Sequence, residues 1–258
     1  MISTHHDNIY VLNNNLLLIY NLDLNLTRTQ KVMAVYTPIL HKNYVAVYKT
    51  LYKISNGDLV AVRIFRKKII GLQTDEEYIV VSESTGNVLI ARRAEHRFQP
   101  LLGHYLQLNK LLIHDSAVIT ADNYKIRVSE YDGRIRNIFF VDNQNVFYNG
   151  GYFYVVYENN LLVYDKKERM DREKCEIGCD TLVLLNKITI DNEVKDVLLL
   201  EGAVYLITDK NNYLVRDSAC RLGAPSPYNF KDAVIDDDSV YFYTEESKLQ
   251  KINVKDLK

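Results

Sequence analysis

The chain has 258 residues, of which 47% are hydrophobic and 25% are charged. This composition supplies enough apolar material for a substantial core, so it excludes a disordered chain. With 32 Lys and Arg against 33 Asp and Glu, the formal net charge is -1. Any nucleic-acid role must therefore come from a local patch or a partner, because the chain as a whole lacks the basic excess of an autonomous binder.

The N-terminus and the cysteines favour a soluble intracellular protein. The first ten residues, MISTHHDNIY, have neither the basic segment nor the long apolar run of a signal peptide. Apolar runs such as 16–20 are far shorter than the ~18 residues that suggest a membrane helix. Three cysteines do not suggest a disulfide framework. Cys175 and Cys179 stand four residues apart, but no second Cys or His pair with zinc-finger spacing follows them, so we expect ordinary thiols.

In chain order, one pattern recurs seven times: an apolar run, a short polar turn, and a second apolar run that ends in a polar or charged residue. The runs are rich in Val, Ile and Tyr, and Asn, Asp, Ser or Gly separate them, as β-hairpins require. The first runs lie at 9–12, 44–48, 78–82, 117–121, 152–157, 204–208 and 240–244. The second runs end at residues 21, 56, 92, 130, 165, 217 and 253.

The spacing of these hairpins predicts the fold. The second runs end 35, 36, 38, 35, 52 and 36 residues apart, so six of the seven units share one period. Repeated hairpins without helical periodicity predict an all-β chain, a seven-bladed WD40-like β-propeller whose four-stranded blades are more compact than the usual ~40–45 residues. We expect residues 1–258 to form one domain, closed by pairing of the N-terminal stretch with the last blade. A solenoid is the structural alternative, but LRR and ankyrin consensus residues are missing.

The long gap between the fifth and sixth units contains an insertion. Its excess residues, KKERMDREKCEIGCDT at 166–181, are charged and poor in large apolar side chains. We expect an exposed loop there and not a strand. Long loops in compact domains are often functional, so a loop that contacts a partner is the alternative to a merely solvated one.

No recognisable catalytic motif occurs in the sequence. GxG, GxSxG, HExxH and EF-hand patterns are all missing. The acidic run 236–238 predicts a solvated turn, and His104, in LLGH, is expected to brace a turn by hydrogen bonding, not to bind a metal or act as a base. Three basic stretches, at 63–68, 91–97 and 166–169, could border an RNA through phosphate contacts. The balanced overall charge favours an ordinary solvated edge for each.

One block of sequence resembles a known family. The matching pieces occur in order: Ser84-Thr85-Gly86-Asn87-Val88, then Leu101-Leu102-Gly103-His104 with Leu108, then Ile119-Thr120-Ala121-Asp122 with Lys125-Ile126-Arg127-Val128-Ser129. They resemble the non-catalytic WD-repeat subunit of the eukaryotic tRNA (guanine-N7) methyltransferase, which also has serine where a WD repeat expects tryptophan. The resemblance covers about a fifth of the chain. The turn at 121–125 is one residue shorter and less charged than in the family.

The resemblance implies a function without chemistry in this chain. The propeller would be an accessory subunit that binds and stabilises a separate catalytic subunit, which forms N7-methylguanosine in the tRNA variable loop. The chain would hold no cofactor, because S-adenosylmethionine would bind the catalytic partner only. It would form a heterodimer with that partner, reach tRNA through the complex, and reside in the nucleus, with the cytoplasm as the alternative location.

The resemblance also implies the partner-binding residues: Asp122, Lys125, Arg127 and Ser129. Strand alternation places Ile126 and Val128 on one face, and Lys125, Arg127 and Ser129 on the other. We expect Lys125 and Arg127 to be available for carboxylates of the enzyme.

Two other functions compete with this interpretation. A general WD-repeat scaffold that binds peptides or protein partners needs only the fold. An enzymatic propeller, such as a lactonase or a quinone-dependent dehydrogenase, would need acidic metal ligands at the central channel, and the sequence identifies none.

Overall fold

The computed structural model describes most of the chain as β-strands. The described residues are 1–13, 15–34, 36–101, 103–114, 116–149, 151–168, 180–190, 192–200, 203–216, 222–226, 228, 230, 232–244 and 248–257. They form 27 strands and one short 3-10 helix. The strands pair antiparallel in seven separate sheets. The chain is a seven-bladed β-propeller, as the repeats predict.

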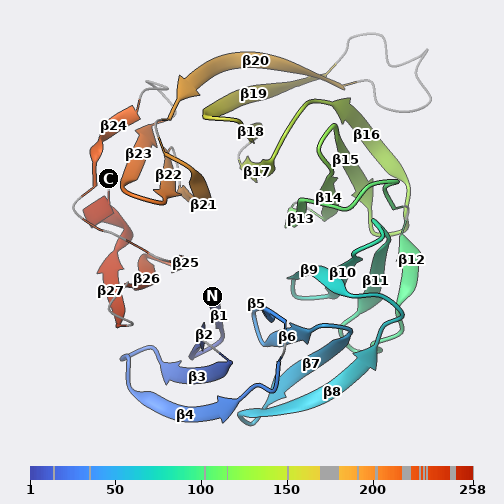
Figure 1. Ribbon diagram of the computed structural model, residues 1–258, viewed down its shortest axis with the longest axis vertical. Coiled ribbons are helices and arrows are strands. Elements are labelled where there is room, and N and C mark those ends of the chain that lie inside the picture. The colour runs from blue at the N-terminus through green and yellow to red at the C-terminus, as the bar shows by residue number, and fades with distance from the viewer. Residues whose placement is uncertain are drawn as a thin grey trace. The chain divides into compact units, whose positions relative to one another are not determined.

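Four of the sheets belong to one compact unit, formed by residues 1–66 and 191–258 (Figure 1). The first sheet contains β1 (Ile2–His5), β2 (Asn8–Asn13), β3 (Leu16–Asn21) and β4 (Leu26–Lys31). The second contains β5 (Ile39–His41), β6 (Tyr44–Val47), β7 (Thr50–Ser55) and β8 (Asp58–Ile64). The other two contain β21 (Val194–Leu200), β22 (Ala203–Thr208), β23 (Asn212–Arg216) and β24 (Leu222–Pro225), and then β25 (Asp232–Asp236), β26 (Ser239–Tyr243) and β27 (Leu249–Asn253), which the 3-10 helix η2 (Val254–Leu257) follows.

Three sheets belong to the second compact unit, residues 67–190. The first contains β9 (Ile69–Thr74), β10 (Tyr78–Glu83), β11 (Val88–Arg92) and β12 (Gln99–Leu101). The next contains β13 (Lys110–His114), β14 (Ala117–Ala121), β15 (Lys125–Glu130) and β16 (Ile135–Phe140). The third contains β17 (Asn145–Asn149), β18 (Tyr152–Tyr157), β19 (Asn160–Glu168) and β20 (Asp180–Thr189).

The predicted hairpins are the second and third strands of each sheet. For example, the hairpin predicted at 117–130 is β14 paired with β15, with Ile119 opposite Val128. Second strands carry most of the core, since every residue of β14 and of β22 is buried. Within the second unit, one apolar cluster joins β10 and β11 to β13 and β14, and another joins β14 and β15 to β17 and β18. Both faces of a middle strand are therefore covered by neighbouring sheets.

The predicted closure by the N-terminal stretch is wrong. Residues 2–5 form β1, which pairs with β2 of the first sheet, because the chain reverses at His6 with a φ of 50°. The last sheet has three strands in the described part of the chain, where four were expected. Side chains join the first and last sheets instead: Ile2, Ile9 and Val11 share an apolar cluster with Tyr241 and Tyr243.

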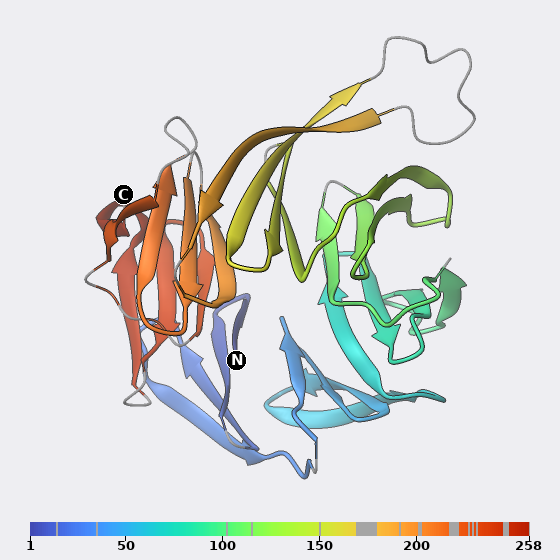
Figure 2. The same cartoon turned by 45° about the horizontal axis from the view of Figure 1, so that its top comes forward.

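The prediction that all of 166–181 is an exposed loop is wrong at both ends. Strand β19 continues to Glu168 and β20 begins at Asp180, with Lys167 opposite Thr181. The Lys166 Nζ lies 3.1 Å from the Asp180 carboxylate, so an ion pair across the hairpin supports this extension. Figure 2 shows β19 and β20 extending beyond β17 and β18 of their sheet. Residues 169–179, including Cys175 and Cys179, lie outside the described residues.

Candidate partner-binding site

The three pieces of the family-like block meet in space. The turn between β10 and β11 holds Gly86, whose carbonyl accepts a hydrogen bond of 2.9 Å from the His104 N–H. A Cβ atom on Gly86 would lie 2.4 Å from the Leu106 carbonyl oxygen and 2.5 Å from that of His104. The φ of Gly86 is 84°, a conformation that favours glycine. Both the positive φ and the lack of space for a Cβ atom therefore explain why glycine occupies this position. The segment 103–106 is therefore held tightly against the Gly86 turn.

His104 connects this segment to the next sheet. Its Nδ1 lies 2.6 Å from the Asp122 carboxylate, and its Nε2 lies 2.7 Å from the Thr120 hydroxyl. All three residues are buried. Because an ionised carboxylate only accepts hydrogen bonds, Nδ1 donates to Asp122, and the neutral ring accepts from Thr120 through Nε2. The prediction that His104 braces this region by hydrogen bonding is confirmed.

Burial and pairing act in opposite directions on this network. Burial lowers the pKa of His104, although the hydrogen bond to Asp122 partly opposes that shift. The pKa of Asp122 is also lowered: burial alone would raise it, but the hydrogen bonds from His104 and from the Tyr124 N–H outweigh burial. The pair is therefore a neutral imidazole beside a carboxylate near neutral pH, a structural brace inside the fold.

Arg127 belongs to the same interior network. Its side chain is 8% exposed, and its Nη1 donates a hydrogen bond of 2.6 Å to the Gly103 carbonyl. Burial lowers the pKa of Arg127, and the nearby Asp122 opposes this effect. The guanidinium thus ties β15 to the segment that precedes Tyr105. The expectation that Arg127 is available on the surface is wrong, because the residue is buried against the segment that contains Gly103.

The other predicted site residues have different surroundings. Asp122 and Ser129 are buried at 3% and 2% exposure, and Ser129 pairs with Val118 beside a bulge in β15. Lys125 keeps part of its surface in solvent. Of the four predicted residues, Lys125 is the one that the structure leaves partly exposed. Partner binding itself stays a prediction.

Exposed hydrophobic residues from nearby segments, together with Lys125, define what we call the Lys125 patch: Tyr105, Leu106, Tyr124, Lys125 and Phe140. Tyr105 is 99% exposed, and the Lys125 Nζ lies 5.8 Å from its ring centroid. Phe140, 81% exposed, is the cross-strand partner of Lys125 on β16. The Tyr124 carbonyl accepts a hydrogen bond of 3.0 Å from Val141, which fixes the turn beside Phe140. Large aromatic side chains are enriched at the centres of protein interfaces.

The sequence analysis missed Tyr105 and Phe140. A signal for Phe140 exists, since Phe139 and Phe140 are adjacent on one strand and must face opposite sides. Phe139 is buried in the cluster with Phe153, so Phe140 faces solvent. No comparable sequence signal identifies Tyr105. Its exposure depends on the packing of residues 103–106 against the Gly86 turn.

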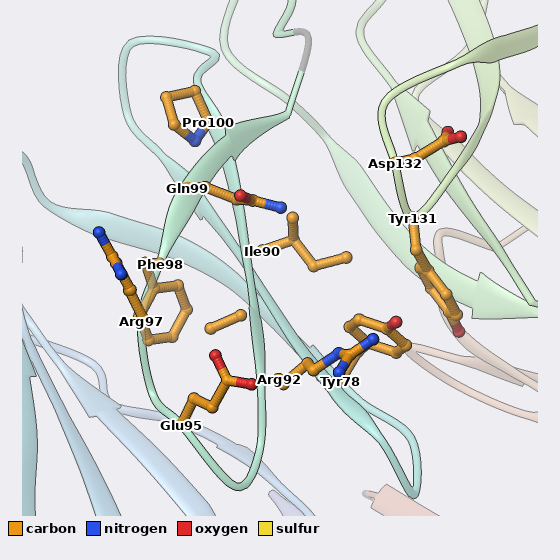
Figure 3. A pocket seen from close by; sticks show the side chains of 11 residues that line it. Tyr78, Ile90, Arg92, Glu95, Arg97, Phe98, Gln99, Pro100, Tyr131 and Asp132 are labelled. Atoms are coloured by element: carbon orange, nitrogen blue, oxygen red, sulfur yellow. The ribbon is translucent and has the colours of Figure 1, made fainter.

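A groove lies near the other end of β15. It has a volume of about 740 Å³ and is bordered by β11, β12 and the turn between β15 and β16. Figure 3 shows Tyr78 and Tyr131 together on one side, with Arg97 and Phe98 on the opposite side. The two tyrosine rings pack with centroids 4.1 Å apart. The groove therefore has a preformed aromatic wall, which suits an extended peptide segment.

The polar groups of the groove hold this wall in place. The Tyr131 hydroxyl donates a hydrogen bond to the Asp75 carboxylate. The pKa of Tyr131 is raised, mainly by burial and also by this hydrogen bond to Asp75. A hydrogen bond between Arg92 and Tyr78 raises the pKa of the exposed Arg92 guanidinium. The rim carries both signs of charge, because Glu95 and Asp132 accompany Arg92 and Arg97.

Solved structures share this architecture at low sequence identity. The chain is similar to the computationally designed Ika8 protein, with a TM-score of 0.67 and 12% identity over 98% of this chain and 83% of that one. It is also similar to KlHsv2 with loop 6CD replaced by a Gly-Ser linker (TM-score 0.65, 12% identity, 98% of this chain and 96% of that one). A third similar structure is BamB from Moraxella catarrhalis (TM-score 0.62, 6% identity, 98% and 84%). The likeness shows the fold alone. No protein-family model matches the chain, and no curated protein does.

Among the residues that the structure describes, no group of three or more His, Cys, Asp and Glu side chains is placed to hold a metal ion. In the same part of the chain, no helix has the length and apolarity that crossing a membrane requires.

Proposed function

We propose that the chain is a non-catalytic accessory subunit that binds and stabilises the catalytic subunit of a tRNA (guanine-N7) methyltransferase. The observation that carries the proposal is the meeting of the three family-like sequence pieces at one place. The Gly86 turn, His104 and the strand of Lys125 are joined by hydrogen bonds, and the Lys125 patch lies on the surface above them. A block that resembles a partner-binding family thus supports an exposed aromatic surface.

Each part of the patch has a role in this proposal. Lys125 pairs with a carboxylate of the enzyme, while Tyr105 and Phe140 cover apolar surface around that ion pair, which excludes water and strengthens it. Asp122, Arg127 and Ser129 act indirectly, by holding β15 and the segment of Tyr105 in place. S-adenosylmethionine and the methylated guanine bind the partner, and this chain takes no cofactor. The complex acts on tRNA in the nucleus.

Co-expression with a catalytic tRNA (guanine-N7) methyltransferase subunit tests the proposal. Lys125→Glu combined with Phe140→Ser should abolish co-purification while the isolated chain keeps its thermal stability. Lys53→Glu is the matched control, because Lys53 is also a partly exposed lysine on the third strand of a sheet. The proposal fails if the double variant assembles with the enzyme as the wild type does.

The groove favours a second candidate function, a general WD-repeat scaffold that binds peptides or protein partners. Its aromatic wall of Tyr78 and Tyr131 is independent of the Lys125 patch. Under this alternative, Tyr78→Ala would weaken capture of a peptide partner, and Lys125→Glu would not. Comparing the two variants against the same partner separates the two functions.

A further inference from the structure

Two stacked tyrosines lie on the surface of the second sheet. The rings of Tyr36 and Tyr48 are 4.6 Å apart with an interplanar angle of 15°, and the residues are 46% and 40% exposed. The Lys49 Nζ lies 5.2 Å from the centroid of the Tyr48 ring. A flat aromatic pair with a cation beside it is the arrangement on which unpaired nucleic-acid bases stack.

Tyr48 occupies a backbone position that suits smaller residues. It is the first residue of the two-residue turn between β6 and β7, where Val47 pairs with Thr50, and its φ is 54°. Glycine and asparagine are the usual residues in such turns, and a bulky side chain there is an outlier. The folded chain therefore presents the Tyr48 ring at a position where the turn itself does not require an aromatic residue.

Three basic residues lie at or near this turn in a chain whose formal net charge is -1. The Lys49 carbonyl accepts a hydrogen bond of 2.7 Å from Phe65, which brings the end of β8 to the turn. Arg63 and Arg66 flank Phe65 there. The acidic residue of β8, Asp58, is at the opposite end of that strand, where it pairs with Arg28 at 2.5 Å.

We infer that the Tyr36–Tyr48 stack and the cations Lys49, Arg63 and Arg66 form a binding site for single-stranded RNA. An unpaired base stacks on the tyrosines, and the lysine and arginines contact the flanking phosphates. The inference goes beyond the proposed function, which needs no RNA contact from this chain. It rests on that function only for the identity of the RNA as an unpaired segment of tRNA.

An acidic protein would also be attracted to these cations, but the parallel tyrosine stack distinguishes the two ligands. Carboxylate side chains gain little from a stacked aromatic pair, whereas every nucleobase has a flat face that packs on it. The groove beside Tyr131 lacks this combination, because Glu95 and Asp132 on its rim repel phosphates.

Fluorescence anisotropy of the isolated full chain with a labelled single-stranded RNA of about 12 nucleotides tests the inference. Tyr48→Gly should weaken binding about tenfold, the effect of losing one stacked base. Its thermal stability should stay equal or rise, since glycine adopts a positive φ without strain. Lys49→Glu should weaken binding further and reduce the dependence on salt by about one phosphate contact. Tyr124→Ala, which removes an exposed tyrosine of the Lys125 patch, is the control and should bind RNA normally.

Three results would overturn the inference. The first is a wild-type chain that does not bind the RNA, and the second is Tyr48→Gly binding as tightly as the wild type. The third is a polyglutamate peptide that competes as effectively as the RNA, which would assign the surface to an acidic protein. Co-purification of Tyr48→Gly with the methyltransferase subunit is a separate readout, so loss of RNA binding and loss of assembly are distinguished.

Discussion

Replacing Arg127 with methionine should destabilise the chain, even though the sequence pattern places Arg127 on a partner-facing surface. The guanidinium is 8% exposed and donates to the Gly103 carbonyl at 2.6 Å. Methionine retains most of the apolar stem but leaves that carbonyl without its charged donor, a loss of about 2 kcal/mol. For a chain of this size, the melting temperature should fall by roughly 4–8 °C. Arg127→Glu should be worse, because it adds a buried carboxylate near Asp122.

Thermal unfolding followed by circular dichroism measures this effect. Lys125→Met is the matched control, since it removes a neighbouring cation from the same strand but at the surface. We expect that control to change the free energy of unfolding by less than about 0.5 kcal/mol. An Arg127→Met variant as stable as the wild type would show that the guanidinium is not part of an interior brace, and the surface role inferred from sequence would return.

The remaining predictions concern the brace and its pH dependence. Gly86→Ala should lower the free energy of unfolding by about 3 kcal/mol, because of its positive φ and the contact with two backbone carbonyls; an unchanged urea midpoint would contradict the tight packing of this turn. Burial lowers the pKa of His104 in the folded chain, so the unfolded chain binds a proton at this residue more readily. The contribution of His104 to the free energy of unfolding is therefore fully present above about pH 6.5 and is lost as the pH falls below that value. His41, whose pKa burial and Lys42 lower to about 4, acts in the same direction. Urea midpoints should therefore be lower at about pH 5.5 than at about pH 7.5, and His104→Gln should weaken that dependence; equal midpoints for the wild type would refute it.

The sequence predicts the middle of each sheet well and its borders poorly. Strands such as β14 and β18 are buried over their whole length or nearly so, so their apolar runs stand out and fix the number of sheets. Outer strands are short or carry polar residues: β12 has three residues with a proline at its centre, and β4 reads LTRTQK. Their position depends on pairing with the third strand, which no local pattern records.

The two errors at the ends of segments share this cause. Residues 2–5 could pair with either the first or the last sheet, and the turn at His6 decides in favour of the first. The charged residues Lys166, Lys167 and Asp180 have low strand propensity, yet they extend a hairpin whose register is already set by β19 and β20. In both places, tertiary pairing overrides local composition.

At the candidate site, the sequence locates the strand but not which side chains reach solvent. Alternation along β15 places Lys125 and Arg127 on the same face. It cannot predict that the segment 103–106 covers this face at Arg127. The same segment exposes Tyr105 beside Lys125. Both outcomes follow from the contact between Gly86 and residues 104–106, which joins parts of the chain about 20 residues apart.

Reconstitution with a catalytic tRNA (guanine-N7) methyltransferase subunit tests the central claim most directly. The measurement is N7-methylguanosine formed in tRNA by the catalytic subunit alone, with this chain, and with the Lys125→Glu and Phe140→Ser double variant. The account predicts a stable heterodimer with raised activity for the wild-type chain, and neither for the double variant. A wild-type chain that neither binds the catalytic subunit nor changes its activity would contradict the account and leave the general peptide-binding scaffold in its place.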